Sequence, residues 1–183
     1  MFSCYKDTIF IWRFQIYLLL CNTEQDSFLL FLGTSSFNNI FGLEILKITY
    51  EGEEVSSTRI ISNEYSINPF QIHINKNNEV LVIAEHAYTN HNNSAFYKLN
   101  SKLSVDTVYT FGTDSTFQTF SFLNEQNNAY YLTGTFSEPS MKFGNDFWVL
   151  KIDESGQQIW DKHFGIDTVN EVASSLQIAG DKI

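Results

Sequence analysis

The histidines are the first residues of this chain that could do chemistry. There are four of them: His73, His86, His91 and His163. His86 and His91 flank the segment 87–90 and Glu85 adjoins them, and imidazole together with carboxylate is a ligand set that suits zinc. Their spacing matches no established zinc pattern. We therefore expect solvated histidines in an asparagine-rich loop and predict no metal-binding residue.

The carboxylates offer a second chemistry, glycoside hydrolysis, which needs two of them facing each other across a sugar. Seven lie near expected turns: Asp106, Asp114, Asp146, Asp153, Glu154, Asp161 and Asp167. The sequence gives no sign that two of them converge on one site. The chain also lacks the GxSxG, Walker, GxGxxG and HExxH motifs. We expect turn and solubility roles for these residues, no catalytic or cofactor-binding residue, no cofactor, and more readily a non-enzyme than an enzyme.

Aromatic side chains are the remaining candidates for ligand contact. Four are expected in or near inter-strand loops: Tyr88, Tyr109, Phe136 and Phe143. Loops on a rigid scaffold are where ligands usually bind, although ordinary packing is the favoured role. Protein and carbohydrate are the expected ligand classes. The net charge of −10 repels phosphates and anionic lipids, so nucleic acid is not an expected partner.

The elements that would position these residues are strands. The chain has 17 Phe and 9 Tyr, and both residue types favour pleated, half-buried surfaces. Asparagine is frequent, in pairs such as Asn77-Asn78, Asn92-Asn93 and Asn127-Asn128. Because asparagine tolerates the left-handed conformation, these pairs are expected in tight turns.

A repeat of about 50 residues organises the strands. Residues 146–160 predict a strand with Trp148, Leu150 and Ile152 on one face, then a turn at Gly156, then a return strand. The same pattern occurs upstream, and aligning Lys47, Lys98 and Lys151 gives steps of 51 and 53 residues. Such a period is typical of propeller blades.

Two further markers support the period. Gly33, Ala84 and Gly134 end similar apolar strands at steps of 51 and 50 residues. A Phe-Gln pair is expected at the start of another strand, at Phe14, Phe70 and Phe117. Each unit therefore holds about four antiparallel strands, which is propeller geometry.

The predicted fold is all-β, a partial β-propeller of about three and a half four-stranded antiparallel blades. We expect one incomplete repeat domain over residues 1–183, with approximate units 1–37, 38–88, 89–138 and 139–183. Three and a half blades cannot close into a ring of four to eight, so we expect a fragment of a longer protein. The alternative is an open or self-associating array of sheets.

The first 21 residues allow two interpretations. Their apolar stretch and Cys21 suggest a signal peptide, but Arg13 and Gln15 interrupt it and bulky leucines precede Cys21. The position of Phe14 in the repeat favours a strand. The stretch is too short to span a bilayer, and no membrane span is expected. A Cys4–Cys21 disulfide is open, with two unpaired thiols favoured.

The segment Leu150–Gly165 resembles a known bacterial repeat. It is similar to the β-propeller repeats of large exported bacterial surface proteins and to quinoprotein-like repeats, in which a lysine strand, a turn glycine, a tryptophan and Phe-Gly recur. The similarity is sharp only in the last unit, since Ser56 stands where Trp160 would be. In such repeats the tryptophan is normally a structural pin between blades.

The resemblance implies a secreted protein located outside the cell, at the cell surface or in the periplasm. The function we expect is a non-catalytic binding or scaffold module. The alternative is part of a propeller enzyme, of the glycoside hydrolase or quinone-dependent dehydrogenase type.

Overall fold

The chain is built from strands. The computed structural model describes residues 5–11, 14–22, 27–37, 40–138, 144–166, 169–173 and 175–179, with side chains described from Phe28 onward except at residues 36–40. These described residues contain thirteen strands and no helix. The all-β prediction is therefore confirmed. None of the described segments is a helix that could cross a membrane.

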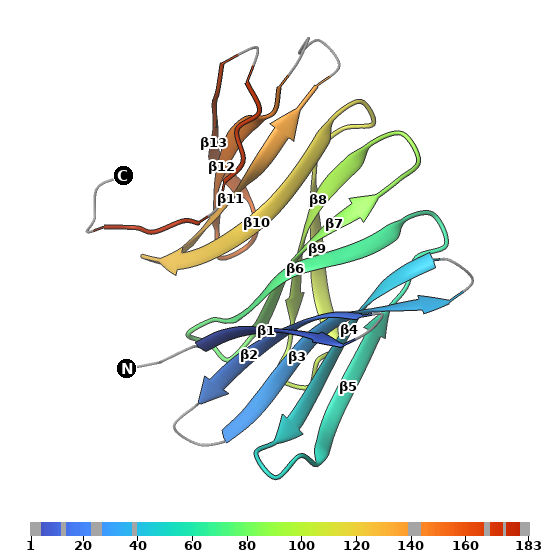
Figure 1. Cartoon of the computed structure of the whole chain (residues 1–183). Helices are drawn as coiled ribbons and strands as arrows, with labels where there is room; N and C mark the ends of the chain where they lie inside the picture. The colour runs from blue at the N-terminus through green and yellow to red at the C-terminus, as the bar shows by residue number, and fades with distance from the viewer. Residues whose placement is uncertain are drawn as a thin grey trace. The chain divides into compact units, whose positions relative to one another are not determined.

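The strands follow one another with short connections (Figure 1). Their bounds are β1 (Tyr5–Ile11), β2 (Phe14–Asn22), β3 (Ser27–Phe37), β4 (Ile40–Thr49), β5 (Glu54–Ile60), β6 (Ser66–Ile74), β7 (Val80–Ala87), β8 (Asn92–Leu99), β9 (Val105–Phe111), β10 (Phe117–Gln126), β11 (Ala129–Ser137), β12 (Asp146–Asp153) and β13 (Gln158–Phe164).

Hydrogen bonding groups these strands into two sheets, of five and eight strands, within which we distinguish three runs of four consecutive strands. The first sheet has the order β1-β2-β3-β4-β5, and the second has the order β13-β12-β11-β10-β8-β7-β6, with β9 paired to β8. We call β2–β5 repeat 1, β6–β9 repeat 2 and β10–β13 repeat 3. Repeats 2 and 3 are joined by a single parallel pair, Asn92 with Phe117. Neither sheet closes on itself, so the structure is a set of open sheets.

Within each repeat the strands are antiparallel neighbours. The registers of repeats 1 and 3 are antiparallel throughout. The strands of repeat 2 are joined by four or five residues, which is too short for the crossover that parallel neighbours need. These sheet boundaries differ from the approximate units 1–37, 38–88, 89–138 and 139–183, because β5 and β6 belong to different sheets.

The predicted strand–turn–strand at the end of the chain is confirmed. Strand β12 buries Trp148, Leu150 and Ile152 and turns Val149 and Lys151 to the other face. The turn to β13 is a five-residue loop. Asp153 N donates to Gln157 O at 3.0 Å and Gly156 N donates to Asp153 O at 3.0 Å. Gly156 has φ +82°, where a glycine has no steric penalty.

The same five-residue loop occurs three more times. It begins at Thr49, Asn75 and Asn100, and each time the first residue's side-chain oxygen accepts from the backbone N–H groups two and four positions later. The fourth position has positive φ in each loop: Gly52 (+90°), Asn78 (+62°), Leu103 (+64°) and Gly156 (+82°). The loop from Asn100, between β8 and β9, has no glycine at its fourth position, and the buried Leu103 takes the left-handed conformation there.

Two sequence markers are placed differently from the prediction. Asn78, Asn127 and Asn128 do occupy left-handed turn positions, but the pair at Asn92 begins strand β8. The Phe-Gln pair starts β2 and β10 as expected, whereas Phe70 lies in the middle of β6. A dipeptide carries little information on register, since strand side chains repeat with a period of only two.

The apolar N-terminal stretch forms β2 over Phe14–Asn22, so the strand expected there is confirmed. Strand β1 precedes it. The starts of β1, β5, β9 and β13 lie at residues 5, 54, 105 and 158, and the repeat spacing therefore gives β1 the place of a fourth strand. Both Cys4 and Cys21, whose pairing the sequence leaves open, lie outside the described side chains.

The chain divides into two compact units. Unit 1 comprises Met1–Val82 and Tyr97–Val108, and unit 2 comprises Ile83–Phe96 and Tyr109–Ile183. In unit 1, β6 contacts β2, β3 and β4, and Leu30, Leu32, Leu43 and Ile45 are fully buried. In unit 2, an aromatic core forms around Phe120, which stacks on Trp148 at 4.3 Å between ring centroids.

Candidate functional site

The two central histidines do not form the expected solvated loop pair. His86 lies in β7 and is only 1% exposed, and its burial lowers its pKa from 6.5 to about 4. His91 lies in the loop before β8, where its ring stacks on Tyr88 at 4.3 Å. Its Nε2 is 3.8 Å from an Asp114 carboxylate oxygen. Across the described residues, no three His, Cys, Asp or Glu side chains come together as metal ligands.

Glu85 has a structural role in unit 2. Its Oε1 accepts from the amide of Asn92 at 2.7 Å and from the hydroxyl of Thr119 at 2.9 Å. Asn92 N also donates to Thr116 O at 3.3 Å. The carboxylate therefore ties β7 to β8 and β10 at the point where the two repeats share their parallel pair. Hydrogen bonds to a charged group are stronger than neutral ones, so this oxygen is committed to the fold.

The carboxylates near turns are spread along the chain. Asp153 accepts from the Ser155 hydroxyl at 2.6 Å and from Gln157 N at 2.9 Å, and these bonds hold its pKa below the ordinary value. Asp161 bonds Gln158 and lies 3.1 Å from His163 Nε2. Asp106 accepts from the Asn100 amide at 3.3 Å. Asp167 lies outside the described residues.

The candidate aromatic residues take packing roles where they are described. Tyr109 lies in β9 and its ring faces Gly156 and Phe96. Phe136 lies in β11, edge-on to the His163 ring at 4.1 Å. Both were expected in or near loops, and both lie within two residues of the end of their strand. Tyr88 is in a loop, half-buried against His91. Phe143 lies outside the described residues.

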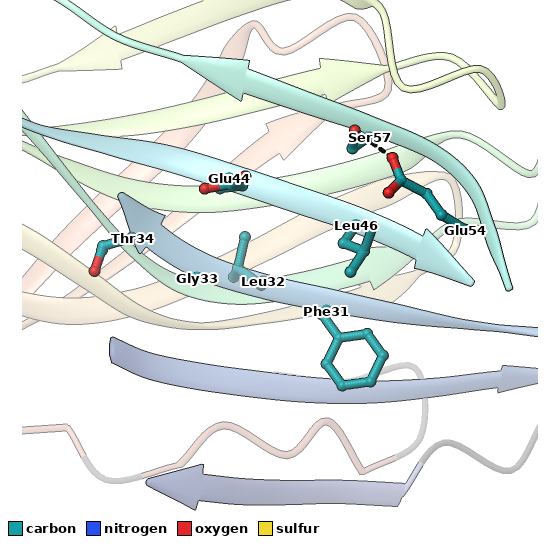
Figure 2. A pocket seen from close by; sticks show the side chains of 8 residues that line it. All are labelled: Phe31, Leu32, Gly33, Thr34, Glu44, Leu46, Glu54 and Ser57. Carbon is teal, nitrogen blue, oxygen red and sulfur yellow. Dashed lines mark hydrogen bonds between the residues drawn. The ribbon is translucent and has the colours of Figure 1, made fainter. Parts of the chain in front are cut away.

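A groove lies on repeat 1, within unit 1 (Figure 2). Its volume is about 370 Å³, within the range of small ligand sites. Strands β3, β4 and β5 line it with equal numbers of apolar and polar residues: Phe31, Leu32, Gly33, Thr34, Glu44, Leu46, Glu54 and Ser57. Register places Phe31 directly opposite Leu46, and Leu46 opposite Ser57. These three side chains share one face of the sheet.

Charged residues border this groove. Arg59 Nη2 bonds Glu44 Oε1 at 3.0 Å and Oε2 at 3.2 Å, and the two side chains are 55% and 37% exposed. An exposed ion pair of this kind contributes little stability. The Ser57 hydroxyl donates to Glu54 at 2.8 Å, as the dashed line in Figure 2 shows. The groove is therefore an apolar strip with an acidic border, suited to binding rather than to proton transfer.

The motif search missed this groove because none of its residues belongs to a catalytic pattern. One signal was present in the repeat. Aligned on Lys47, Lys98 and Lys151, Glu44 occupies the position of Ala95 and Trp148. A carboxylate at a position that is apolar in the other repeats indicates a face left open to solvent.

No protein-family model matches the chain, and no curated protein matches its sequence.

Proposed function

We propose that the chain is a stack of β-propeller blades that serves as a non-catalytic binding or scaffold module of an exported or cell-surface bacterial protein. One observation carries the proposal. Each repeat is a run of four strands with apolar residues on both faces, set within the sheets of five and eight strands, and such a run buries both faces only by stacking against neighbours of its own kind. Four-stranded sheets at this period are the units of a propeller.

The burial of the fourth strands supports the blade interpretation. Strands β5, β9 and β13 are mostly exposed along their length, as the outermost strand of a blade would be. The first strand of a propeller blade faces the central channel; of β2, β6 and β10, only β6 is an edge strand here, since β2 also pairs with β1 and β10 with β8. Among their residues Glu125 is the sole carboxylate. Small, amide and apolar side chains at such a mouth favour a scaffold over a glycoside hydrolase.

The chemistry-bearing side chains already serve the fold, which favours binding over catalysis. The carboxylates of Glu85 and Asp153 accept hydrogen bonds that hold strands or turns. His86 is held neutral by burial. Export is supported by the resemblance of Leu150–Gly165 to repeats of exported proteins, and fractionation of the producing cells tests it: a cytoplasmic location of the intact protein contradicts this part of the proposal.

Dye binding to the groove tests the module as a binding surface. A hydrophobic fluorescent dye at low protein concentration is expected to bind the folded chain saturably, and Leu46→Asp is expected to weaken this binding at least about tenfold because it places a charge in the apolar strip. Val55→Asp is the matched control, since Val55 is 53% exposed and lies outside the groove lining. Equal dye binding by both variants contradicts a groove site.

Enzyme assays test the alternative. A propeller enzyme would turn over chromogenic glycosides or reduce a dye when supplied with a quinone and an alcohol. Turnover that saturates with substrate, and that disappears in a carboxylate variant which still folds, would replace the scaffold proposal with the enzyme.

A further inference from the structure

The third strands of the three repeats carry two faces that differ in burial. Face A holds Leu46, Tyr97 and Leu150 at equivalent positions of β4, β8 and β12. Tyr97 is 2% exposed and Leu150 is fully buried, whereas Leu46 is half-buried. The next position on this face shows the same order, a half-buried residue and then two buried ones: Ile48, Leu99 and Ile152. Face A is therefore covered in repeats 2 and 3 and open in repeat 1.

Face B shows the opposite order. Ile45 and Phe96 are fully buried, and the equivalent Val149 is only half-buried. Phe147 is 37% exposed at a position where the first two repeats have fully buried residues. On the neighbouring β13, Phe164 pairs with Phe147 and is exposed as well. Face B is therefore covered in repeats 1 and 2 and open in repeat 3.

The five-residue loops give an independent measure of the same asymmetry. Gly156 in repeat 3 is buried, with the Tyr109 ring of β9 against it. Leu103 in repeat 2 is 1% exposed. Gly52 in repeat 1 is exposed, and an added Cβ there would meet no atom within 4 Å. The loop of repeat 1 thus lacks the cover that its equivalents have.

The contacts within each unit identify what covers face A. In unit 2, Phe96 on face B of repeat 2 packs on Tyr130 of repeat 3 at 5.4 Å between ring centroids. Tyr130 pairs with Ile152 and so lies on face A. In unit 1, β6 of repeat 2 lies against β3 and β4. Face B of one repeat therefore covers face A of the next.

We propose that the groove on face A of repeat 1 binds face B of repeat 3 from a second copy of this chain, head to tail. This inference rests on the proposed function, since it treats the repeats as stacking blades. The open face B offers the complementary surface. It presents Val149 and Phe147 with Lys151 and Lys162 beside them, and these cations match the acidic border of the groove, where Glu54 is exposed.

The arrangement also limits the size of the assembly. A contact between two different faces closes into a ring or extends into a filament, depending on the rotation between copies. Two copies supply six four-stranded repeats, and propellers close with four to eight. The expected product is a closed dimer in which each copy contributes one face A and one face B.

Sedimentation velocity from about 1 μM to about 200 μM protein tests the pairing. The wild-type chain is expected to sediment at twice the mass of the chain as concentration rises. Leu46→Lys blocks face A and Val149→Lys blocks face B, and each variant alone is expected to stay monomeric. Both positions are half-buried, so a lysine can keep its charge in water. Val55→Lys, outside the groove, is expected to associate like the wild type.

The mixing experiment is the decisive arm. In an equimolar mixture, Val149→Lys supplies an intact face A and Leu46→Lys supplies an intact face B, so a 1:1 dimer is expected. Because only one of the two contacts can form, this dimer is expected to need a higher protein concentration than the wild-type dimer. If either lysine variant fails to fold by circular dichroism, Glu54→Lys and Lys162→Glu replace the pair. Each surface change is expected to weaken association roughly threefold in low salt.

Two results overturn the proposal. A wild-type chain that stays monomeric over the whole concentration range excludes the head-to-tail contact. If such a chain still binds dye in the groove, the binding-module proposal stands. If it neither associates nor binds dye, both the head-to-tail contact and the binding-module proposal are excluded. Association that Leu46→Lys abolishes and Val149→Lys leaves unchanged indicates a contact of face A with itself, which the proposal does not allow.

Discussion

Replacing Gly156 by alanine tests whether the loop of repeat 3 is packed against the preceding repeat. Two costs add at this position. With φ +82°, an alanine there is strained by about 1–2 kcal/mol. An added Cβ would also overlap the ring of Tyr109, and forcing an extra carbon into a packed site costs about 1–3 kcal/mol. We expect Gly156→Ala to destabilise the chain by about 2–5 kcal/mol in total.

Gly52 provides the matched control. It has φ +90° in the same loop of repeat 1, but an added Cβ meets open space. Gly52→Ala is therefore expected to show only the backbone strain, about 1–2 kcal/mol. The difference between the two variants, about 1–3 kcal/mol, isolates the contact with Tyr109.

Urea unfolding measures both variants. Far-ultraviolet circular dichroism follows the whole chain. In a Trp12→Phe background the fluorescence of Trp148 and Trp160 follows unit 2, because the chain divides into two compact units that need not unfold together. With a slope of about 1–3 kcal/mol per molar urea, the two midpoints are expected to differ by roughly 1 M.

A second background separates packing from strain. In a Tyr109→Ala chain the ring is absent, so Gly156→Ala is expected to cost no more than Gly52→Ala. Equal losses for the two glycine variants in the wild-type chain, or an unchanged cost of Gly156→Ala without the ring, would refute the packing of this loop on β9.

Three further predictions follow from single sites. His86 stays neutral in the folded chain down to pH about 4, its lowered pKa, whereas in the unfolded chain it binds a proton below about pH 6.5. Between these values the unfolded state therefore holds more protons than the folded state. The free energy of unfolding is expected to keep the full contribution of neutral His86 above pH 6.5 and to fall by about 2–3 kcal/mol toward pH 4. The fall in unfolding free energy between pH 6.5 and pH 4, measured by urea unfolding, is expected to become smaller in His86→Gln and to stay unchanged in the exposed-site control His163→Gln. Gly134→Ala is expected to cost about 3 kcal/mol or more, because its Cβ would overlap the Thr119 carbonyl oxygen; wild-type stability in urea would contradict this. Leu103→Gly relieves about 1 kcal/mol of left-handed strain but loses the burial of a leucine, about 1.5–3 kcal/mol, so a net loss is expected in urea and a gain would contradict the burial.

The repeat was predictable because its signals are local. Alternation of Trp148, Leu150 and Ile152 sets the face of β12, and Gly156 marks its turn, so both are visible within a dozen residues. The markers Gly33 and Gly134 lie in equivalent strands, β3 and β11, as predicted. Gly134 shows why glycine is needed there, since Thr119 of the neighbouring β10 leaves no room for a side chain.

The errors came from residues whose position depends on distant partners. Asn92 looks like a turn residue, yet its amide bonds Glu85 and its backbone bonds Thr116 across the sheet, and these contacts place it in β8. His86 follows Glu85 after an apolar run, and the two polar residues conceal the continuation of β7. Such partners are brought together by the fold and have no local pattern.

The open face of repeat 1 was encoded in the sequence, but only through comparison of its own repeats. Glu44 and Arg59 form an exposed ion pair across β4 and β5, at a position where repeat 2 has the buried Ala95 and repeat 3 has the buried Trp148. A buried site would make this pair costly, because desolvation of two charges can exceed their attraction. The pair is therefore tolerated only where no preceding sheet lies directly on it. Any partner on this face must leave the two charges at its border and take the apolar strip at Leu46, and the head-to-tail partner with Lys162 at its own border meets that condition.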